Sequence, residues 1–219
     1  SRAIREEEAA MATQNGVEYI ELQVAMDGLV VAVSPENDFV DYLTVDELKK
    51  IWEPNSPVRY WSDVRPEWPQ EEIKLYGPGP DSGTFDYFTE AVVGEGGASR
   101  ADYNASEDDN VLVIGVSGDK YSLGYFGYAY YEVNKDKIRP VPVDGGLGPV
   151  EPTVENINQG TYAPLSRPVY IYVNKEAYDT RREVKAFVQY YMDIVNDIAL
   201  EVGFIPMRDD VLAEQKAKL

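Results

Sequence analysis

A strand, a tight turn and a helix start follow one another directly between residues 73 and 97. Ile73-Lys74-Leu75-Tyr76 has the pattern of a short strand, and Gly77-Pro78-Gly79-Pro80 ends it. Asp81-Ser82-Gly83-Thr84 then opens a helix, which the glycine-rich residues 94–97 stop. The sequence therefore predicts a helix whose first turn lies at the end of a strand.

This helix start is a candidate anion site. The first backbone N–H groups of a helix lack intrahelical partners, and the aligned peptide dipoles leave partial positive charge there. Ser82 and Thr84 would add hydroxyl donors, while Gly83, which has no Cβ, lets the backbone approach a tetrahedral ligand. Taken alone, the motif fits equally well an ordinary turn in which Asp81 or Ser82 is only the N-cap.

Composition narrows the function. The 219 residues, 44% of them hydrophobic, suit one large domain or two modest ones with a proper core. The 39 acidic and 20 basic residues give a net charge of −19, which disfavours nucleic acid as a partner. The chain has no cysteine or histidine, so thiol nucleophiles, imidazole bases and Cys/His zinc sites are excluded. No cofactor or metal is expected.

The rest of the chain alternates strand and helix patterns. We expect strands at residues 19–25 and 29–33, joined by a turn at Asp27-Gly28, and further strands at 123–131 and 168–173; helices are expected at 44–52, from 106 and at 176–203. The run Ser106-Glu107-Asp108-Asp109 predicts a capping box. A calcium loop is the alternative for this run, but the EF-hand spacing and its distal glutamate are missing.

Several motifs together resemble one family, the PstS-type phosphate-binding proteins of the high-affinity phosphate ABC transporter. They are Asp27-Gly28-Leu29-Val30-Val31, Leu43-Thr44-Val45-Asp46-Glu47-Leu48, Asp81-Ser82-Gly83-Thr84, Leu123-Gly124-Tyr125-Phe126-Gly127 and Val202-Gly203-Phe204-Ile205-Pro206. The resemblance covers essentially the whole chain. It implies an α/β fold, the two-lobed type II clamshell of periplasmic binding proteins, with phosphate bound in the cleft between the lobes.

Carried over by position, Ser82, Gly83 and Thr84 match the family's Ser-Gly-Thr phosphate cradle. Many relatives place an arginine four residues before that serine, where this chain has Pro78. Arg100 is the candidate replacement, because its loop resembles that of the family branch with Gly-Pro-Gly before Asp-Ser-Gly-Thr. Its guanidinium would fork onto two phosphate oxygens, with Asp102 orienting it. The alternative is that Arg100 merely sits among surface acids.

Ser1-Arg2-Ala3-Ile4 resembles the family's segment just after a phosphate-contacting aspartate. The resemblance implies a complete second lobe, residues 33–168, and a first lobe, residues 1–32 and 169–219, that lacks its N-terminal strands, first anion loop and that aspartate. In the family this aspartate accepts a protonated phosphate oxygen and so rejects sulfate. We expect the apolar surface left uncovered to bind the missing segment as a separate chain or to drive self-association.

The implied function is capture of inorganic phosphate in the periplasm or at the cell surface for delivery to a membrane permease, without covalent chemistry. One alternative is an interaction or structural fragment that binds phosphate weakly or not at all. Another is a binder of a different oxyanion, such as arsenate, sulfate or molybdate. Phosphoester hydrolysis at Ser82 is the third, but the sequence offers no histidine base and no two-metal carboxylate set.

Overall fold

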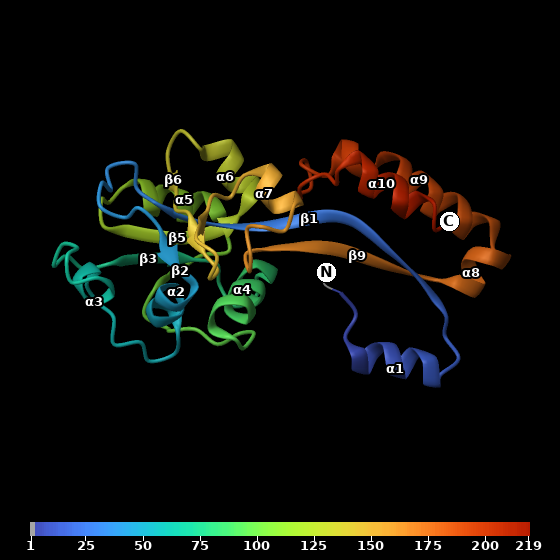
Figure 1. Cartoon of the computed structure of the whole chain (residues 1–219), viewed down its shortest axis with the longest axis horizontal. Coiled ribbons are helices and arrows are strands. Elements are labelled where there is room, and N and C mark those ends of the chain that lie inside the picture. Colours follow the sequence, from blue (N-terminus) through green and yellow to red (C-terminus); the bar gives the residue numbers. More distant parts are fainter. Residues whose placement is uncertain (1–2) are drawn as a thin grey trace. The chain divides into compact units, whose positions relative to one another are not determined.

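Residues 3–219 are described by the structure, a computed structural model (Figure 1). The chain divides into two compact units, one of Gly28–Ser166 and one that combines the residues up to Asp27 with Arg167–Leu219. It passes between them within β1 (Tyr19–Val33) and at the start of β9 (Ser166–Asn174). The expected lobe boundaries, 32/33 and 168/169, fall in the same two strands. The assignment of the units as lobes stays a prediction.

The sheet of the Gly28–Ser166 unit has the strand order β4-β3-β5-β1-β6. The part of the sheet at the β4 edge is parallel, since β3 (Lys74–Gly77) pairs in parallel with both β4 (Asn104–Ala105) and β5 (Ser122–Gly127). The Leu29–Val33 part of β1 runs antiparallel to β5 and to β6 (Arg139–Pro140). That run is almost fully buried, as its continuous apolar sequence predicts.

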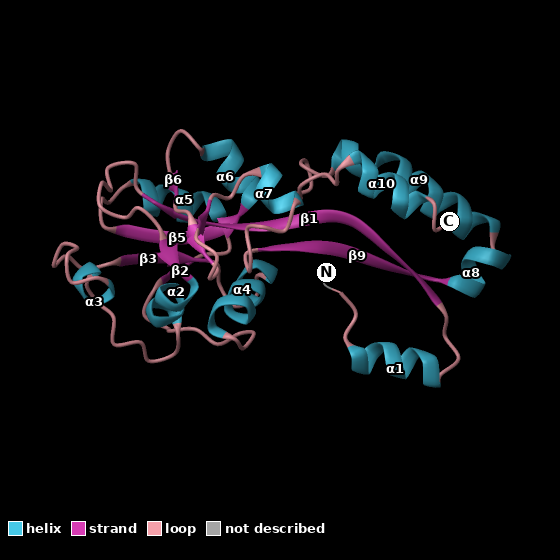
Figure 2. Ribbon diagram, in the orientation of Figure 1, coloured by secondary structure: helices cyan, strands magenta, loops and turns pink. Residues whose placement is uncertain are grey.

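Helices cover both faces of this sheet (Figure 2). On one face, the Tyr76 ring fills the space beside Gly115 of α5 (Asp109–Ser117). On the other, Gly77 faces Trp52 of α2 (Val45–Trp52). Neighbouring residues of a strand point to opposite faces, so β3 is sandwiched between these helices. The remaining helices of this unit are α3 (Trp61–Val64), α4 (Gly83–Phe88), the π-helix η1 (Thr89–Val93), α6 (Tyr128–Asn134) and α7 (Val154–Asn158).

Helix α2 confirms the capping box that the sequence predicts. The Thr44 hydroxyl accepts a hydrogen bond from the Glu47 backbone N–H at 3.1 Å, and the Glu47 carboxylate accepts one from the Thr44 N–H at 2.8 Å. Thr44 also ends β2 (Leu43–Thr44), which with β7 (Val143–Asp144) and β8 (Pro149–Val150) forms a small three-stranded sheet. The apolar face of α2 is buried in the core.

The other unit packs helices against β9 and the Tyr19–Asp27 part of β1, two strands that pair with each other. Its helices are α1 (Glu6–Gln14), α8 (Lys175–Thr180), α9 (Arg182–Ile198) and α10 (Asp209–Lys216). Leu22 and Val24 of β1 join Val188, Met192 and Val195 of α9 in one buried cluster. Away from this cluster, α9 exposes Phe187 and Tyr190.

Three expected element boundaries are wrong. Asp27-Gly28 is not a turn: β1 runs unbroken through it, and the missing Cβ of Gly28 makes room for the Ile157 side chain of α7. Residues 128–131 are helical in α6 rather than part of a strand. The expected helix 176–203 breaks at Arg181, whose φ of −111° and ψ of 108° are extended. Ser1 and Arg2, half of the segment that suggested a truncated lobe, lie outside the described residues.

Candidate functional site

The predicted turn lies at the C-terminal end of β3, where β4 also ends. Ser82 is the N-cap of α4, because its hydroxyl accepts a hydrogen bond from the Thr84 N–H at 3.2 Å. The Ser82 N–H donates to the Gly79 carbonyl at 3.1 Å and closes the turn. The N-cap in the alternative interpretation is therefore present. It leaves room for an anion, because one cap satisfies only one of the several unpaired donors at a helix start.

Gly83 opens this helix start to a ligand. A Cβ built on Gly83 would meet nothing within 4 Å, so the space beside the first helical residue is empty of protein. Within residues 3–219, the structure shows no acceptor for the Gly83 N–H. The turn thus combines an unpaired backbone donor, open space and the side chains of Ser82 and Thr84 on one short segment. Such an arrangement favours a small oxyanion.

Side chains from neighbouring elements hold the turn in place. The Tyr103 hydroxyl donates to the Pro78 carbonyl at 2.7 Å, and the Ser106 N–H donates to the Gly77 carbonyl at 3.2 Å. The Glu107 carboxylate occupies the space that a Cβ on Gly79 would need. The segment after β4 therefore packs along the turn. Sequence reasoning missed these contacts because β4 spans only two residues and leaves no periodic pattern.

Arg100 does not have the surroundings that the sequence suggested for a phosphate ligand. Its side chain is 6% exposed. One terminal nitrogen donates to the Ile51 and Val58 carbonyls, each at 2.9 Å, while Nε and the other terminal nitrogen donate to the Asp102 carboxylate at 2.6 and 2.8 Å. These bonds use four of the five N–H donors of a guanidinium. Asp102 orients Arg100 as predicted, but the pair of N–H donors expected to bind phosphate donates to the Asp102 carboxylate instead.

The Arg100 ion pair also affects its partner. The hydrogen bond from the guanidinium lowers the pKa of the Asp102 carboxyl below its usual range, even though Asp102 itself is exposed. A buried guanidinium that satisfies two carbonyls of a helix end and its following loop is a structural feature. We therefore assign Arg100 to holding the C-terminal end of α2. The alternative that it sits among surface acids is also wrong, since the side chain is buried.

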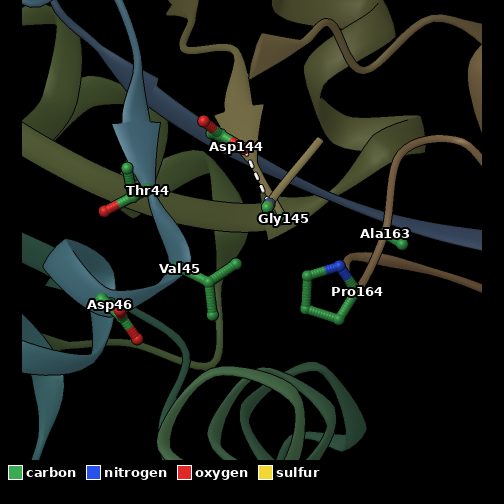
Figure 3. A pocket seen from close by; sticks show the side chains of 8 residues that line it. Thr44, Val45, Asp46, Asp144, Gly145, Ala163 and Pro164 are labelled. Carbon is green, nitrogen blue, oxygen red and sulfur yellow. Dashed lines mark hydrogen bonds between the residues drawn. The ribbon is translucent and has the colours of Figure 1, made fainter. Parts of the chain in front are cut away.

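A cavity of about 470 Å³ lies elsewhere in the Gly28–Ser166 unit (Figure 3). It is lined by Thr44, Val45, Asp46, Asp144, Gly145, Gly146, Ala163 and Pro164. The Asp144 carboxylate already has partners within the chain: it accepts hydrogen bonds from the Gly146 and Gly148 N–H groups at 2.7 and 3.0 Å. None of the predicted site residues lines this cavity. Its acidic side chains make it a poor place for an anion.

Asp109 is the first residue of helix α5 and follows Glu107 and Asp108 in the sequence. Burial, and secondarily the nearby Asp108 carboxylate, raises the pKa of the Asp109 carboxyl from 3.8 to about 6; a hydrogen bond with Tyr130 partly opposes this. The predicted capping box does not form: Asp108 rather than Ser106 is the N-cap, and its carboxylate accepts a hydrogen bond from the Asn110 N–H at 2.9 Å. The run neither forms the predicted cap at Ser106 nor belongs to a metal cluster among residues 3–219.

The raised pKa of Asp109 has a consequence for stability. The folded chain binds the proton of the Asp109 carboxyl more tightly than the unfolded chain does. The stability that this proton adds to the folded chain is therefore fully present below pH 4 and is lost as the pH rises through 6. Replacing Asp109 with asparagine should raise the free energy of unfolding by about 1 kcal/mol at pH 7.5, a value reduced for partial solvent exposure, and by almost nothing at pH 4. Urea unfolding at both pH values measures this.

The matched control is Asp136→Asn, which removes one charge from an exposed carboxylate. It should leave the stability nearly unchanged at both pH values. An equal gain for the two variants would mean that only the net charge matters. No gain for Asp109→Asn at pH 7.5 would show that its carboxyl is not held at a raised pKa.

The described residues contain no helix that is both long and apolar enough to span a membrane. They also hold no group of three or more histidine, cysteine, aspartate or glutamate side chains arranged around a common metal position. The turn of residues 77–84 itself presents backbone N–H groups and the hydroxyls of Ser82 and Thr84.

Comparison with known proteins places these observations in a family. Residues 1–193 match the model of the PBP superfamily domain. Protein SphX from Synechocystis is 47% identical over 212 residues, which cover 96% of this chain and 63% of the relative. The phosphate-binding protein PstS from Staphylococcus saprophyticus is 39% identical over 220 residues, which cover 100% of this chain and 67% of the relative.

A solved structure gives the same result. The crystal structure of a possible phosphate binding protein from Planctomyces limnophilus superposes with a TM-score of 0.91 at 43% identity, covering 100% of this chain and 78% of that chain. A PstS structure from Borrelia burgdorferi, at 22% identity and a TM-score of 0.71, supports the fold. The chain spans 63% of the length of the SphX relative. It belongs to the PBP superfamily and, within it, to the PstS-type phosphate-binding proteins, with their type II α/β fold.

Proposed function

We propose that this chain captures inorganic phosphate, with Ser82, Gly83 and Thr84 as the part of the site that the Gly28–Ser166 unit supplies. The observation that carries the proposal is the helix start at Gly83, whose N–H has no acceptor within the described residues and whose Cβ position faces open space. The names of the PstS relatives and of the Planctomyces structure support phosphate as the anion. The protein acts by binding and is not an enzyme.

The turn can hold a phosphate despite the net charge of −19. Hydrogen bonds from backbone N–H groups and hydroxyls act over about 3 Å, whereas exposed charges more than about 10 Å away are screened by salt. Two opposing charges lie at the turn: Asp81 within it and the Glu107 carboxylate beside Gly79. Binding therefore depends on local donors, and neither Pro78 nor Arg100 supplies the guanidinium that many relatives use.

Isothermal titration calorimetry tests the proposal. Two samples are used: the protein purified from its natural source, called the native protein, and the 219-residue chain. Each is titrated with phosphate and, separately, with sulfate, arsenate and molybdate. We expect phosphate to bind at least tenfold more tightly than sulfate. If phosphate fails to bind to either sample, or if another oxyanion binds more tightly, the proposed function is wrong. If only the native protein binds phosphate, the 219-residue chain behaves as the weakly binding fragment that we considered as an alternative.

The proposal extends to the setting in which binding is useful. We place the protein in the periplasm or at the cell surface, where it would deliver phosphate to the membrane permease of an ABC transporter. A Vibrio cholerae structure described as an ABC-type phosphate transport receptor shares the fold at 21% identity and a TM-score of 0.74. The exposed Phe187 and Tyr190 on α9 support a further contact, either with another chain segment or with a second copy.

A further inference from the structure

The Tyr125 side chain carries a buried polar group that the proposed site has not used. Tyr125 is 0% exposed, and its hydroxyl has no hydrogen-bond partner within the part of the chain that the structure describes. Buried hydroxyls almost always have a partner, because leaving one unpaired costs free energy that folding must offset elsewhere. An unpaired buried donor is therefore a candidate for a contact that forms only when a ligand is present.

The ring of Tyr125 is held firmly on one face of the sheet. It stacks on Phe88 of α4, with ring centroids 3.7 Å apart and planes 10° apart. Trp52 of α2 meets the same ring edge-on, with centroids 4.9 Å apart. Phe88 lies in the same short helix that Gly83 begins. The Tyr125 ring thus packs directly against the helix whose first turn forms the proposed site.

The hydroxyl end of this ring lies at Gly77, the first residue of the turn of residues 77–84. A Cβ on Gly77 would be 2.8 Å from Cε1 and 3.2 Å from Cζ of Tyr125, the carbon that bears the hydroxyl. Gly77 is the last residue of β3, and the turn closed by the Gly79–Ser82 hydrogen bond follows it. Only a glycine at position 77 lets the phenol approach the backbone so closely. The unpaired hydroxyl is therefore next to the segment that leads into the cradle.

Tyr103 and Tyr125 differ in their hydrogen bonding. Both phenols lie at the same turn, and the two interact electrostatically. The Tyr103 hydroxyl donates to the Pro78 carbonyl, whereas the Tyr125 hydroxyl has no acceptor among the described residues. Burial raises the pKa of Tyr125 far above its usual range, so its hydroxyl stays protonated and remains a donor. The Tyr103 hydroxyl thus holds the turn, whereas the Tyr125 hydroxyl is an unpaired donor beside Gly77.

We propose that Tyr125 is an affinity-determining residue of the site and that its hydroxyl donates a hydrogen bond to the bound oxyanion. This inference rests on the proposed function. A tetrahedral oxyanion needs more donors than one short helix start provides, and hydrogen bonds to a charged acceptor in a buried place are the strong ones. Position 78 is a proline rather than an arginine, and the Arg100 guanidinium already donates to protein acceptors. The buried Tyr125 hydroxyl therefore supplies one of the hydrogen bonds that a guanidinium would donate to the oxyanion.

Tyr125→Phe tests the proposal, with Tyr162→Phe as the matched control. Tyr162 is a buried tyrosine of the same unit, 1% exposed, whose hydroxyl lies near the Val31 backbone. Each variant loses one buried hydroxyl and keeps the ring. We expect phosphate affinity to fall about tenfold in Tyr125→Phe, which corresponds to about 1.4 kcal/mol, and to change less than twofold in Tyr162→Phe. Tyr125→Phe should not melt at a lower temperature than the unchanged protein, because its hydroxyl has no partner among the described residues.

Two outcomes overturn the inference while leaving the proposed function intact. The first is phosphate binding by the unchanged protein with equal affinity in Tyr125→Phe. The second is an equal loss of affinity in both variants. If Tyr125→Phe fails to fold, a crystal structure of the unchanged protein with phosphate decides: we expect the Tyr125 hydroxyl about 2.7 Å from a phosphate oxygen, and a separation beyond 4 Å contradicts the inference. Absence of phosphate binding by the unchanged protein would instead refute the proposed function and, with it, the role of Tyr125.

Discussion

Replacing Ser82 with aspartate should lower phosphate affinity at least a hundredfold while the chain stays folded. Aspartate is as good an N-cap as serine, so its carboxylate can accept the Thr84 N–H and retain the start of α4. The same carboxylate would place a negative charge where the phosphate is proposed to sit. Titration calorimetry measures the affinity, and thermal unfolding monitored by circular dichroism confirms that the variant is folded.

Thr153→Asp is the control for this variant. Thr153 is the N-cap of α7 in the same unit, and its hydroxyl accepts the Asn156 N–H at 3.1 Å. It should leave phosphate affinity unchanged, since the added charge lies at another helix. If Ser82→Asp binds phosphate as well as the unchanged protein does, Ser82 is only a cap and the alternative interpretation of the turn is correct.

Arg100→Met should lower the free energy of unfolding by about 3 kcal/mol and leave the phosphate affinity of the folded protein within about twofold. Methionine fills much of the space of the arginine stem but donates no hydrogen bonds. The buried Ile51 and Val58 carbonyls would each lose a donor. Urea unfolding measures the stability, and calorimetry at a temperature well below the transition measures the affinity.

Arg59→Met is the comparison for Arg100→Met, because the Arg59 side chain is 69% exposed and its ion pair with Glu72 is long, at 3.8 Å. A surface pair of this kind contributes little, so stability should change by less than about 1 kcal/mol. The opposite pattern for Arg100→Met, a stable protein with a large loss of phosphate affinity, would restore Arg100 as the phosphate ligand suggested by the resemblance.

The sequence predicted correctly those features that depend on residues close together in the chain. The capping box of Thr44 and Glu47, the strand at residues 73–76 and the helix start at Ser82 all depend on residues within a few positions of one another. Such signals are satisfied by the chain's own neighbouring backbone groups, so a single sequence contains them.

The predictions that failed depend on contacts distant in sequence. Gly28 looked like a turn residue, but it is a strand residue that gives space to Ile157. Arg100 looked like a free guanidinium, but the carbonyls that bind it belong to residues 51 and 58. The unpaired Tyr125 hydroxyl becomes visible only when β3 and β5 pair and bring it to Gly77. No periodicity or spacing reports these contacts, because each follows from packing rather than from local preference.

The most direct test of the phosphate turn is the backbone amide signals of Gly83 and Thr84 in a ¹⁵N-labelled sample during titration with phosphate. Hydrogen bonds to a phosphate oxygen should shift both amide protons strongly, and Gly83 most, because its N–H has no acceptor within the described residues. Sulfate at the same concentration should cause smaller shifts. If phosphate binds while these two signals stay unchanged and others move, the anion sits elsewhere and the account of this turn as a phosphate cradle is wrong.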